Sequence, residues 1–395
     1  MTASAPLMAP PTLRTFDADG GTVTVSGDCD PRFEPLLDAF IDNFVTRREL
    51  GAGVAVYLEG RKVVDLWGGH RDPARTIPWG QNTMVGMASV VKGMLAFCLH
   101  LLADHGRLDY DQPVARYWPE FAQAGKERIT VRQAISHHAA IHFADQARAG
   151  DLFRWHPLVD AIAAQRPEWE PGTRGVYHTI TIIPILGELI SRVAGRSFLD
   201  AFRDEITVGL GVDYHVGLGP AELARYSIDY DTEPFLAGIP VAPEVVARFF
   251  KPSGNPATDL TDDERAHMVF TGAGGTARGV ARLFAIAAEN GTFEGRRIMS
   301  PRTIDLMTEE QWYAKCAVWG TPMRVALGLL LNDPEFFYIG PNPKAFGTAG
   351  AGGSLGMADR QHRLSVGYAV NRWWPALALG DRARTLIDAT YQCLS

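Results

Sequence analysis

Near both ends of the chain, hydrophobic residues form short runs that are typical of β-strands. Residues 53–58 and 62–67 are two such runs, and Gly60 in the short connection between them predicts a hairpin. Further runs of this kind cover residues 323–331, 353–358 and 364–370. Apolar residues at helical spacing predict one additional helix near each end, at 31–50 and 374–394.

In the middle of the chain, segments with apolar residues at helical spacing alternate with loops rich in proline and glycine. The helices predicted there cover residues 89–105, 111–118, 130–137, 181–195, 196–205 and 276–290. Strands at both ends with helices between them predict an α/β fold, in which one sheet is built from the two terminal parts beside a mainly helical insertion. We therefore expect a flexible N-terminus at 1–15, an α/β domain at 16–75 and 312–395, and a mainly helical domain at 76–311.

Composition and charge exclude several classes of function. Of the 395 residues, 46% are hydrophobic, which supplies a sizeable core without disulfides or metals. A formal net charge of −7 and the lack of a basic run argue against a nucleic-acid partner. The four cysteines are too scattered for a zinc site or a disulfide framework, and neither a signal peptide nor a membrane-spanning stretch is visible. We expect a soluble, cytoplasmic protein.

The segment Ser89-Val-Val-Lys92 carries the most informative chemistry. At the start of a helix these two residues lie on one face, which brings the lysine amine near the serine hydroxyl. The helix N-terminus adds partial positive charge, and a buried lysine with a lowered pKa accepts the proton of a serine nucleophile. The alternative is that Ser89 only caps the helix and Lys92 is solvated. Lys92 is one of only six lysines, however, and it lies in an apolar stretch.

Two further segments follow downstream in a characteristic order. Tyr177 begins the sequence Tyr-His-Thr on a loop before a helix, and a glycine-rich run spans residues 346–356 before a strand. Together with the segment around Ser89, these motifs resemble those of the serine β-lactamase-like superfamily, in particular its class C-like branch, which includes the family VIII carboxylesterases. The resemblance covers most of residues 30–390, and the three motifs in this order are more specific than any one of them.

The resemblance implies a fold and a set of roles. The fold is an antiparallel sheet from the N- and C-terminal segments, flanked by helices, with a catalytic cleft between this domain and the helical domain. Ser89 is implied to be the acylated nucleophile, Lys92 its proton acceptor, and Tyr177 the group that shuttles a proton with Lys92 to the leaving group. The backbone N–H groups of Ser89 and Ala351 are implied to form the oxyanion hole. No cofactor and no metal are implied.

Two positions depart from the family pattern. Thr179 stands where relatives have the asparagine of Tyr-x-Asn, and Thr348 stands where they have lysine, histidine or tryptophan in the motif that ends at Gly350. The cation that holds a β-lactam or peptide carboxylate is therefore missing, which favours a neutral ester or small amide. We expect Thr179, Thr348 and Gly350 to border the substrate, and the aromatic Phe346 and Trp373 to contact it.

The resulting hypothesis is a serine hydrolase that cleaves small carboxylic esters through an acyl-enzyme. Three alternatives stay open: an acyltransferase or transesterase on the same site, an amide hydrolase, and a non-catalytic binding protein of the same fold. The expected partner is a small-molecule ester or amide, without nucleic acid or membrane. The sequence leaves a homo-oligomer open.

Two other segments are lookalike motifs: each matches the sequence pattern of a known functional site but lacks the neighbouring secondary structure which that site requires. Ser354 lies in a Gly-x-Ser-x-Gly pattern, which in α/β-hydrolases joins a strand to a helix, whereas here we expect another strand to follow. Residues 272–277 match a dinucleotide-binding pattern at the start of a helix. No βαβ unit surrounds them, so we interpret the glycines as tight packing of a loop against that helix.

Two polar clusters also have simpler interpretations. His137, His138 and His142 lack the flanking carboxylate and the helical spacing of a zinc site, so we interpret them as hydrogen-bonded loop residues. Asp109 and Asp111 are expected to stabilise a turn and a cap and not to form a catalytic carboxylate pair.

Overall fold

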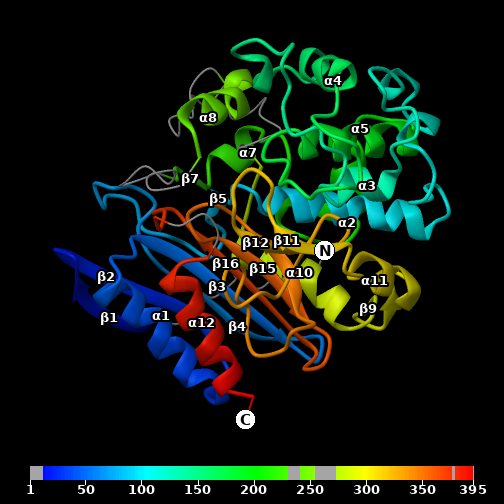
Figure 1. The fold of residues 1–395 in the computed structure, drawn as a ribbon. Coiled ribbons are helices and arrows are strands. Elements are labelled where there is room, and N and C mark those ends of the chain that lie inside the picture. Colours follow the sequence, from blue (N-terminus) through cyan, green and yellow to red (C-terminus); the bar gives the residue numbers. More distant parts are fainter. Residues whose placement is uncertain (1–11, 230–240, 254–272, 376–378, 395) are drawn as a thin grey trace, which may run out of the picture.

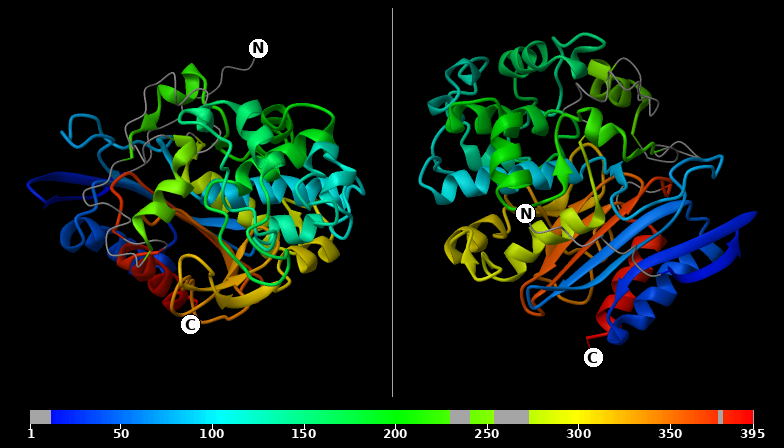
Figure 2. Two further views of the ribbon diagram at one scale, coloured as in Figure 1. Left: turned by 45° about the horizontal axis from the view of Figure 1, so that its top comes forward. Right: turned by 180° about the vertical axis from the view of Figure 1, so that it is seen from behind.

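The computed structural model describes residues 12–229, 241–253, 273–375 and 379–394. A region built around a large sheet lies against a mainly helical region, and the three views agree on this arrangement (Figures 1 and 2). The strands drawn in blue and orange-red, from the two ends of the chain, share the sheet, whereas the cyan and green helices gather on one side of it. No helix among the described residues has the length and apolar character needed to cross a bilayer.

The main sheet joins the two ends of the chain. Its ten strands are ordered β1-β2-β4-β3-β16-β15-β14-β13-β12-β11, and neighbouring strands are antiparallel. Their bounds are β1 (Thr12–Ala18), β2 (Gly21–Cys29), β3 (Gly51–Leu58), β4 (Arg61–Gly69), β11 (Trp312–Lys315), β12 (Pro322–Val325), β13 (Leu330–Leu331), β14 (Phe346–Ala349), β15 (Leu355–Asp359) and β16 (Leu364–Val370). The two ends meet where β3 pairs with β16, from Ala52 opposite Val370 to Leu58 opposite Leu364. The predicted fold class is therefore confirmed.

Helices cover both faces of this sheet. On one face, α1 (Glu34–Thr46) packs beside α12 (Asp381–Gln392), and on the other α10 (Ala277–Ala288) lies against β3, β15 and β16 (Figure 1). Side chains alternate between the faces along a strand. Val54 accordingly belongs to the hydrophobic cluster under α1 and α12, and Ala55 to the cluster that contains α10. The contact with α10 requires a glycine in β16, because a Cβ at Gly367 would lie 2.2 Å from the carbonyl oxygen of Ala277.

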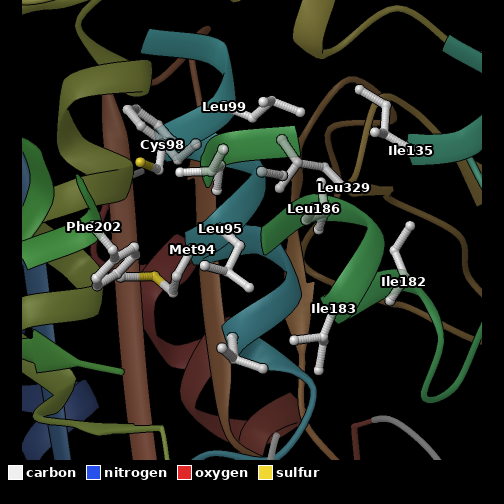
Figure 3. Packing of buried hydrophobic residues seen from close by; sticks show 14 of the residues in the cluster. Met94, Leu95, Cys98, Leu99, Ile135, Ile182, Ile183, Leu186, Phe202 and Leu329 are labelled. Atoms are coloured by element: carbon white, nitrogen blue, oxygen red, sulfur yellow. The ribbon is translucent and has the colours of Figure 1, made fainter. Parts of the chain in front are cut away.

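The helical region surrounds one buried helix, α2. Among the described residues, the helices outside the sheet region are α2 (Val90–Asp104), α3 (Val131–Ile135), α4 (Trp155–Ala164), α5 (Ile182–Ala194), α6 (Phe198–Phe202), α7 (Pro220–Leu223), α8 (Pro243–Phe249) and α11 (Pro301–Met307). Short strands accompany them: β5 (Met84–Gly86), β6 (Tyr214–His215), β7 (Tyr226–Ser227), β8 (Gly274–Gly275), β9 (Thr292–Phe293) and β10 (Arg296–Arg297). Met94, Leu95 and Leu99 of α2 lie in one hydrophobic cluster with Ile183 and Leu186 of α5 (Figure 3). This packing fixes the position of the α2 N-terminus.

Several predicted boundaries are wrong for identifiable reasons. Residues 323–331 form two strands and not one, because Gly328 has a φ of +74° and reverses the chain, so that Val325 pairs with Leu330. Residues 111–118 contain only a short 3₁₀ turn at Val114–Arg116, since Pro113 is itself extended, with a ψ of 140°, and disfavours the helical conformation in the residue before it. Part of the stretch expected to be flexible is ordered, because β1 begins at Thr12 and pairs with β2.

Two further differences lie in the C-terminal part. The last helix begins at Asp381 and not at residue 374, after Pro375, which disfavours the helical conformation in the residue before it. The strand β14 lies at the start of the glycine-rich run, before the strand predicted at 353–358, and it pairs with β13 and β15. Its four residues are followed by several glycines, which are depleted in strands, so the run as a whole gave no clear strand signal at 346–349.

Candidate active site

Ser89 and Lys92 meet at the N-terminus of α2. Ser89 is the residue before the helix, and its side chain makes no capping hydrogen bond, so the simpler role of a helix cap does not occupy its hydroxyl. The Lys92 Nζ donates a hydrogen bond to the Ser89 Oγ at 2.6 Å. Ser89 is partly exposed, whereas Lys92 is buried with 5% of its surface accessible. Ser89 is therefore the more accessible member of the pair, and Lys92 is the buried one.

Burial changes the protonation of Lys92. It lowers the pKa of the amine to about 7, because the charged form loses its hydration. Near neutral pH a substantial fraction of Lys92 is thus uncharged and able to accept a proton. The amine also lies 5.2 Å from the centre of the Tyr177 ring, which places the third predicted catalytic residue beside the pair.

Tyr177 lies on the loop that precedes α5. Burial raises the pKa of its phenol to about 12, and a hydrogen bond with Ser89 acts in the opposite direction. Tyr177 consequently keeps its proton at neutral pH and is a hydrogen-bond donor. The structure thus brings Ser89, Lys92 and Tyr177 together, although the loop is far from α2 along the chain.

The end of β14 packs against the segment around Ser89. The Thr348 Oγ1 donates a hydrogen bond to the Ser89 carbonyl oxygen at 3.3 Å. Gly350 approaches the backbone just before the serine so closely that a Cβ there would lie 2.1 Å from the carbonyl oxygen of Met87. Ala351 follows directly in the turn after β14 and is partly exposed. This places it at the edge of the site where the resemblance implies an oxyanion hole.

The residues expected to bind substrate have different environments. Thr348 is buried with 5% of its surface accessible, beside Gly93 of α2. The Thr179 Oγ1 is buried and has no hydrogen-bond partner in the described part of the chain. Trp373 is partly exposed, packs on Gly352 and donates a hydrogen bond from Nε1 to the Asp229 Oδ2 at 3.2 Å.

Phe346 does not present a surface to a substrate. Its side chain has 0% of its surface accessible and belongs to the core cluster that contains α2 and α10. We therefore assign Phe346 a packing role in place of the substrate contact expected from its position in the glycine-rich run. A sequence pattern places an aromatic residue near a site but does not say to which face of the strand it points.

The lookalike motifs have structural roles. Ser354 lies in the turn between β14 and β15, where its carbonyl oxygen accepts the N–H of Gly350 at 2.8 Å, so the strand-to-helix elbow is absent around it. Of the dinucleotide-like segment 272–277, residue 272 lies outside the described residues. Residues 274–275 form the short strand β8 before α10.

The histidine cluster is hydrogen-bonded only in part, because the His142 Nδ1 is buried and has no hydrogen-bond partner in the described part of the chain. The His137 Nδ1 accepts the backbone N–H of His178 at 3.0 Å. The described residues contain no group of three or more His, Cys, Asp or Glu side chains with the geometry of a metal site. Asp109 accepts the N–H of Asp111 at 2.9 Å in a turn, and Asp111 pairs with Arg132 at 2.7 Å.

Two side chains that the sequence analysis did not assign to the site hold Tyr177. The ring of His137 lies 4.7 Å from the Tyr177 ring, centre to centre. The Cys316 Sγ accepts the backbone N–H of Tyr177 at 3.3 Å across 139 positions of sequence. Both residues lie in segments without a catalytic motif, so only their position in space reveals the contact.

Comparisons with known proteins identify the family to which the chain is related. The family model described as Beta-lactamase matches residues 37–390. The esterase/beta-lactamase LipL of Mycobacterium tuberculosis is 30% identical over 372 residues, which cover 91% of this chain and 86% of that protein.

Two solved structures cover 93% of this chain and 99% of their own. A family VIII carboxylesterase has a TM-score of 0.84 at 37% identity. A penicillin-binding protein homologue from Caulobacter crescentus has a TM-score of 0.86 at 35% identity. These matches confirm the resemblance inferred from the motifs. The chain belongs to the beta-lactamase family.

Proposed function

We propose that this protein is a serine hydrolase that cleaves small carboxylic esters through an acyl-enzyme intermediate. The observation that carries the proposal is the 2.6 Å hydrogen bond between the Lys92 Nζ and the Ser89 Oγ, beside a protonated Tyr177. A relative in the same family, LipL, is described as an esterase/beta-lactamase, and a structural neighbour as a family VIII carboxylesterase. Both descriptions support ester hydrolysis.

The proposed cleft lies between the two parts of the chain. One side is the α/β domain, residues 16–75 and 312–395, which supplies the turn after β14. The other side is the helical domain, residues 76–311, which supplies the α2 N-terminus and the loop of Tyr177. A contact between Gly350 and the backbone before Ser89 supports this division, because it joins the two sides next to the nucleophile.

The geometry supports two chemical half-reactions. In acylation, the Ser89 Oγ attacks the ester carbonyl carbon while neutral Lys92 takes the hydroxyl proton. The N–H groups of Ser89 and Ala351 stabilise the negative oxygen of the tetrahedral intermediate. The bond to the alcohol then breaks, and the alcohol leaves with a proton supplied through Lys92 and Tyr177. In deacylation, water attacks the acyl carbon and gives a proton to the same pair; the bond between the acyl carbon and the Ser89 Oγ then breaks, the proton passes to that oxygen, and the acid is released.

Ester hydrolysis and acyl transfer use the same acyl-enzyme, so product analysis separates these two; a p-nitroanilide of the same acyl group tests amide hydrolysis. The purified protein is incubated with a series of p-nitrophenyl esters of increasing chain length, in water and with added methanol. For a hydrolase we expect the free acid as the main product in both media. A methyl ester as the main product would assign an acyltransferase. Lack of any p-nitrophenol release would favour the non-catalytic binding protein.

The pH dependence of turnover is expected to report Lys92. Its pKa is about 7, and only the neutral amine accepts the serine proton, so kcat/KM for the ester should rise with pH through about 7. Tyr177 stays protonated over the same range because its pKa is about 12. The measurement is a pH profile of kcat/KM. A profile that is flat through neutrality, or that falls with rising pH, would contradict Lys92 as the base.

β-Lactams are expected to be poor substrates. Thr348 provides no cation for the carboxylate of a β-lactam, and a desolvated anion without a partner is unfavourable. We expect kcat/KM for nitrocefin to be at least about 10²-fold below that for the best p-nitrophenyl ester, a difference of roughly 2.8 kcal/mol. Steady-state kinetics on the two chromogenic substrates measure this ratio, with Ser89→Ala as the background control. Nitrocefin turnover as fast as ester turnover would refute the expected preference.

A further inference from the structure

We propose that His137 is a positioning residue that holds Tyr177 in its catalytic place by clamping the peptide groups on both sides of it. This inference rests on the proposed function, because it concerns the reaction in which Tyr177 takes part. It gives a role to a histidine that the serine, lysine and tyrosine motifs do not include.

The first observation is a set of hydrogen bonds around Tyr177. The His137 carbonyl oxygen accepts the N–H of Val176 at 3.0 Å, and the His137 Nδ1 accepts the N–H of His178 at 3.0 Å. The N–H between them, that of Tyr177 itself, donates to the Cys316 Sγ at 3.3 Å. Three successive amides are thus held from outside their own segment.

These bonds matter because the segment has no regular structure of its own. Residues 175–178 belong to no helix or strand, and α5 begins only at Ile182. Buried backbone N–H groups need partners, and here two of the three partners belong to one residue. The conformation of the loop at Tyr177 therefore depends on His137 more than on neighbouring residues in the sequence.

The second observation is the position of the imidazole ring. It faces the Tyr177 ring at 4.7 Å between centres and 32° between planes, so the histidine also limits rotation of the phenol. Burial and the nearby charge of Lys92 lower the pKa of His137 to about 3, which keeps the ring neutral. Since Nδ1 accepts a hydrogen bond, the neutral ring carries its proton on Nε2.

The third observation is the backbone of His137, which has a φ of +63°. Among residues other than glycine, asparagine and aspartate adopt this left-handed conformation most readily. Asparagine also carries an oxygen at the position of the imidazole Nδ1. His137→Asn therefore keeps the backbone preference and the acceptor but removes the ring, whereas His137→Phe keeps a ring and removes the acceptor.

This pair of variants tests the clamp. Misplacement of a catalytic group by about 1 Å costs on the order of 10²-fold in rate, so we expect His137→Phe to lower kcat by that factor with KM little changed. His137→Asn is expected to retain kcat to within about 10-fold of the wild type, because the acceptor that holds the His178 N–H is kept. His138→Ala is the matched control, since its ring contacts Trp312 and not Tyr177, and it should leave kcat unchanged.

A double-mutant cycle separates positioning from a general effect on folding. If His137 acts through Tyr177, then His137→Phe should have little further effect on kcat in a Tyr177→Phe background. Independent, multiplicative losses would overturn the proposal. So would equal kcat in His137→Phe and the wild type, or an Asn variant as impaired as the Phe variant. Thermal unfolding checks each protein, and failure of the Asn variant to fold would also count against the clamp.

The wild-type enzyme tests the proposed function, on which the clamp depends. If the wild type releases no p-nitrophenol from any ester, the proposed function fails, and the clamp fails with it as a catalytic device. If the wild type is active and the His137 variants do not follow the expected order, only the clamp fails. The two failures are therefore distinct in the same set of assays.

Discussion

Replacing Ser89 with alanine is expected to abolish ester turnover and covalent labelling by a serine-directed phosphonate. The phosphonate traps the nucleophilic oxygen, so the intact mass of the wild-type protein should increase by one adduct. Ser89→Ala removes that oxygen while the backbone N–H and the start of α2 remain. Intact-protein mass spectrometry after reaction measures the adduct directly and needs no knowledge of the natural substrate.

Ser354→Ala is the matched control for this experiment. Ser354 lies in the other nucleophile-like motif, but it belongs to a turn between two strands, where its backbone oxygen holds the Gly350 N–H. The substitution leaves that backbone contact in place, so the variant should retain the adduct and ester turnover. An adduct lost only in Ser354→Ala would reassign the nucleophile and contradict the proposed mechanism. A wild type that forms no adduct would favour a binding protein of this fold.

The second large effect is expected for Lys92. Without the amine at 2.6 Å, nothing takes the Ser89 proton at this position, and general base catalysis contributes about 10²- to 10⁴-fold. We expect Lys92→Ala to lower kcat/KM for a p-nitrophenyl ester by roughly 10³-fold. The free energy of unfolding should decrease because the buried aliphatic stem is lost, while removal of an amine whose charged form is disfavoured by desolvation offsets part of that cost, so we expect the variant to stay folded. Stopped-flow measurement of acylation and a thermal unfolding curve report the two quantities.

Lys92→Arg distinguishes the base from the positive charge. Arginine stays protonated in proteins, so it keeps a cation near Ser89 but does not accept a proton. Both Lys92 variants should therefore be slow, and their pH profiles should lack the rise near pH 7 expected for the wild type. Rapid acylation in Lys92→Ala would exclude the assigned base, and rapid acylation in Lys92→Arg alone would show that only the charge is needed.

Much of the proposed catalytic site was predictable from the sequence because its central pair, Ser89 and Lys92, is local. Ser89 and Lys92 are three positions apart, and a helix brings such residues to one face whatever surrounds it. The lysine-poor composition and the apolar stretch around Lys92 indicated burial, which is the cause of its lowered pKa. The order of three motifs was enough to identify the family, which the comparisons confirm.

Other features depended on contacts between distant segments. The strand β14 is only four residues long and leads into a series of glycines, so its pairing with β13 and β15 is what defines it. Phe346 lies in that strand with its side chain in the core, and nothing in the sequence indicated which face it occupies. Trp373 was expected to contact the substrate. The sequence did not indicate its hydrogen bond to Asp229, because the two residues are far apart in the chain.

The sequence by itself determined that Ser89 and Lys92, the proposed reactive pair, lie together, because they are three positions apart at the start of a helix, and the order of three motifs determined the family. The tertiary structure decided how Tyr177 is held, because the groups that fix its loop come from His137 and Cys316, in other segments. The backbone groups of a helix form hydrogen bonds within the helix, so residues three positions apart lie on one face in any surroundings. The backbone groups of an irregular loop find their hydrogen-bond partners in other parts of the fold. Those partners become neighbours only when the chain has folded.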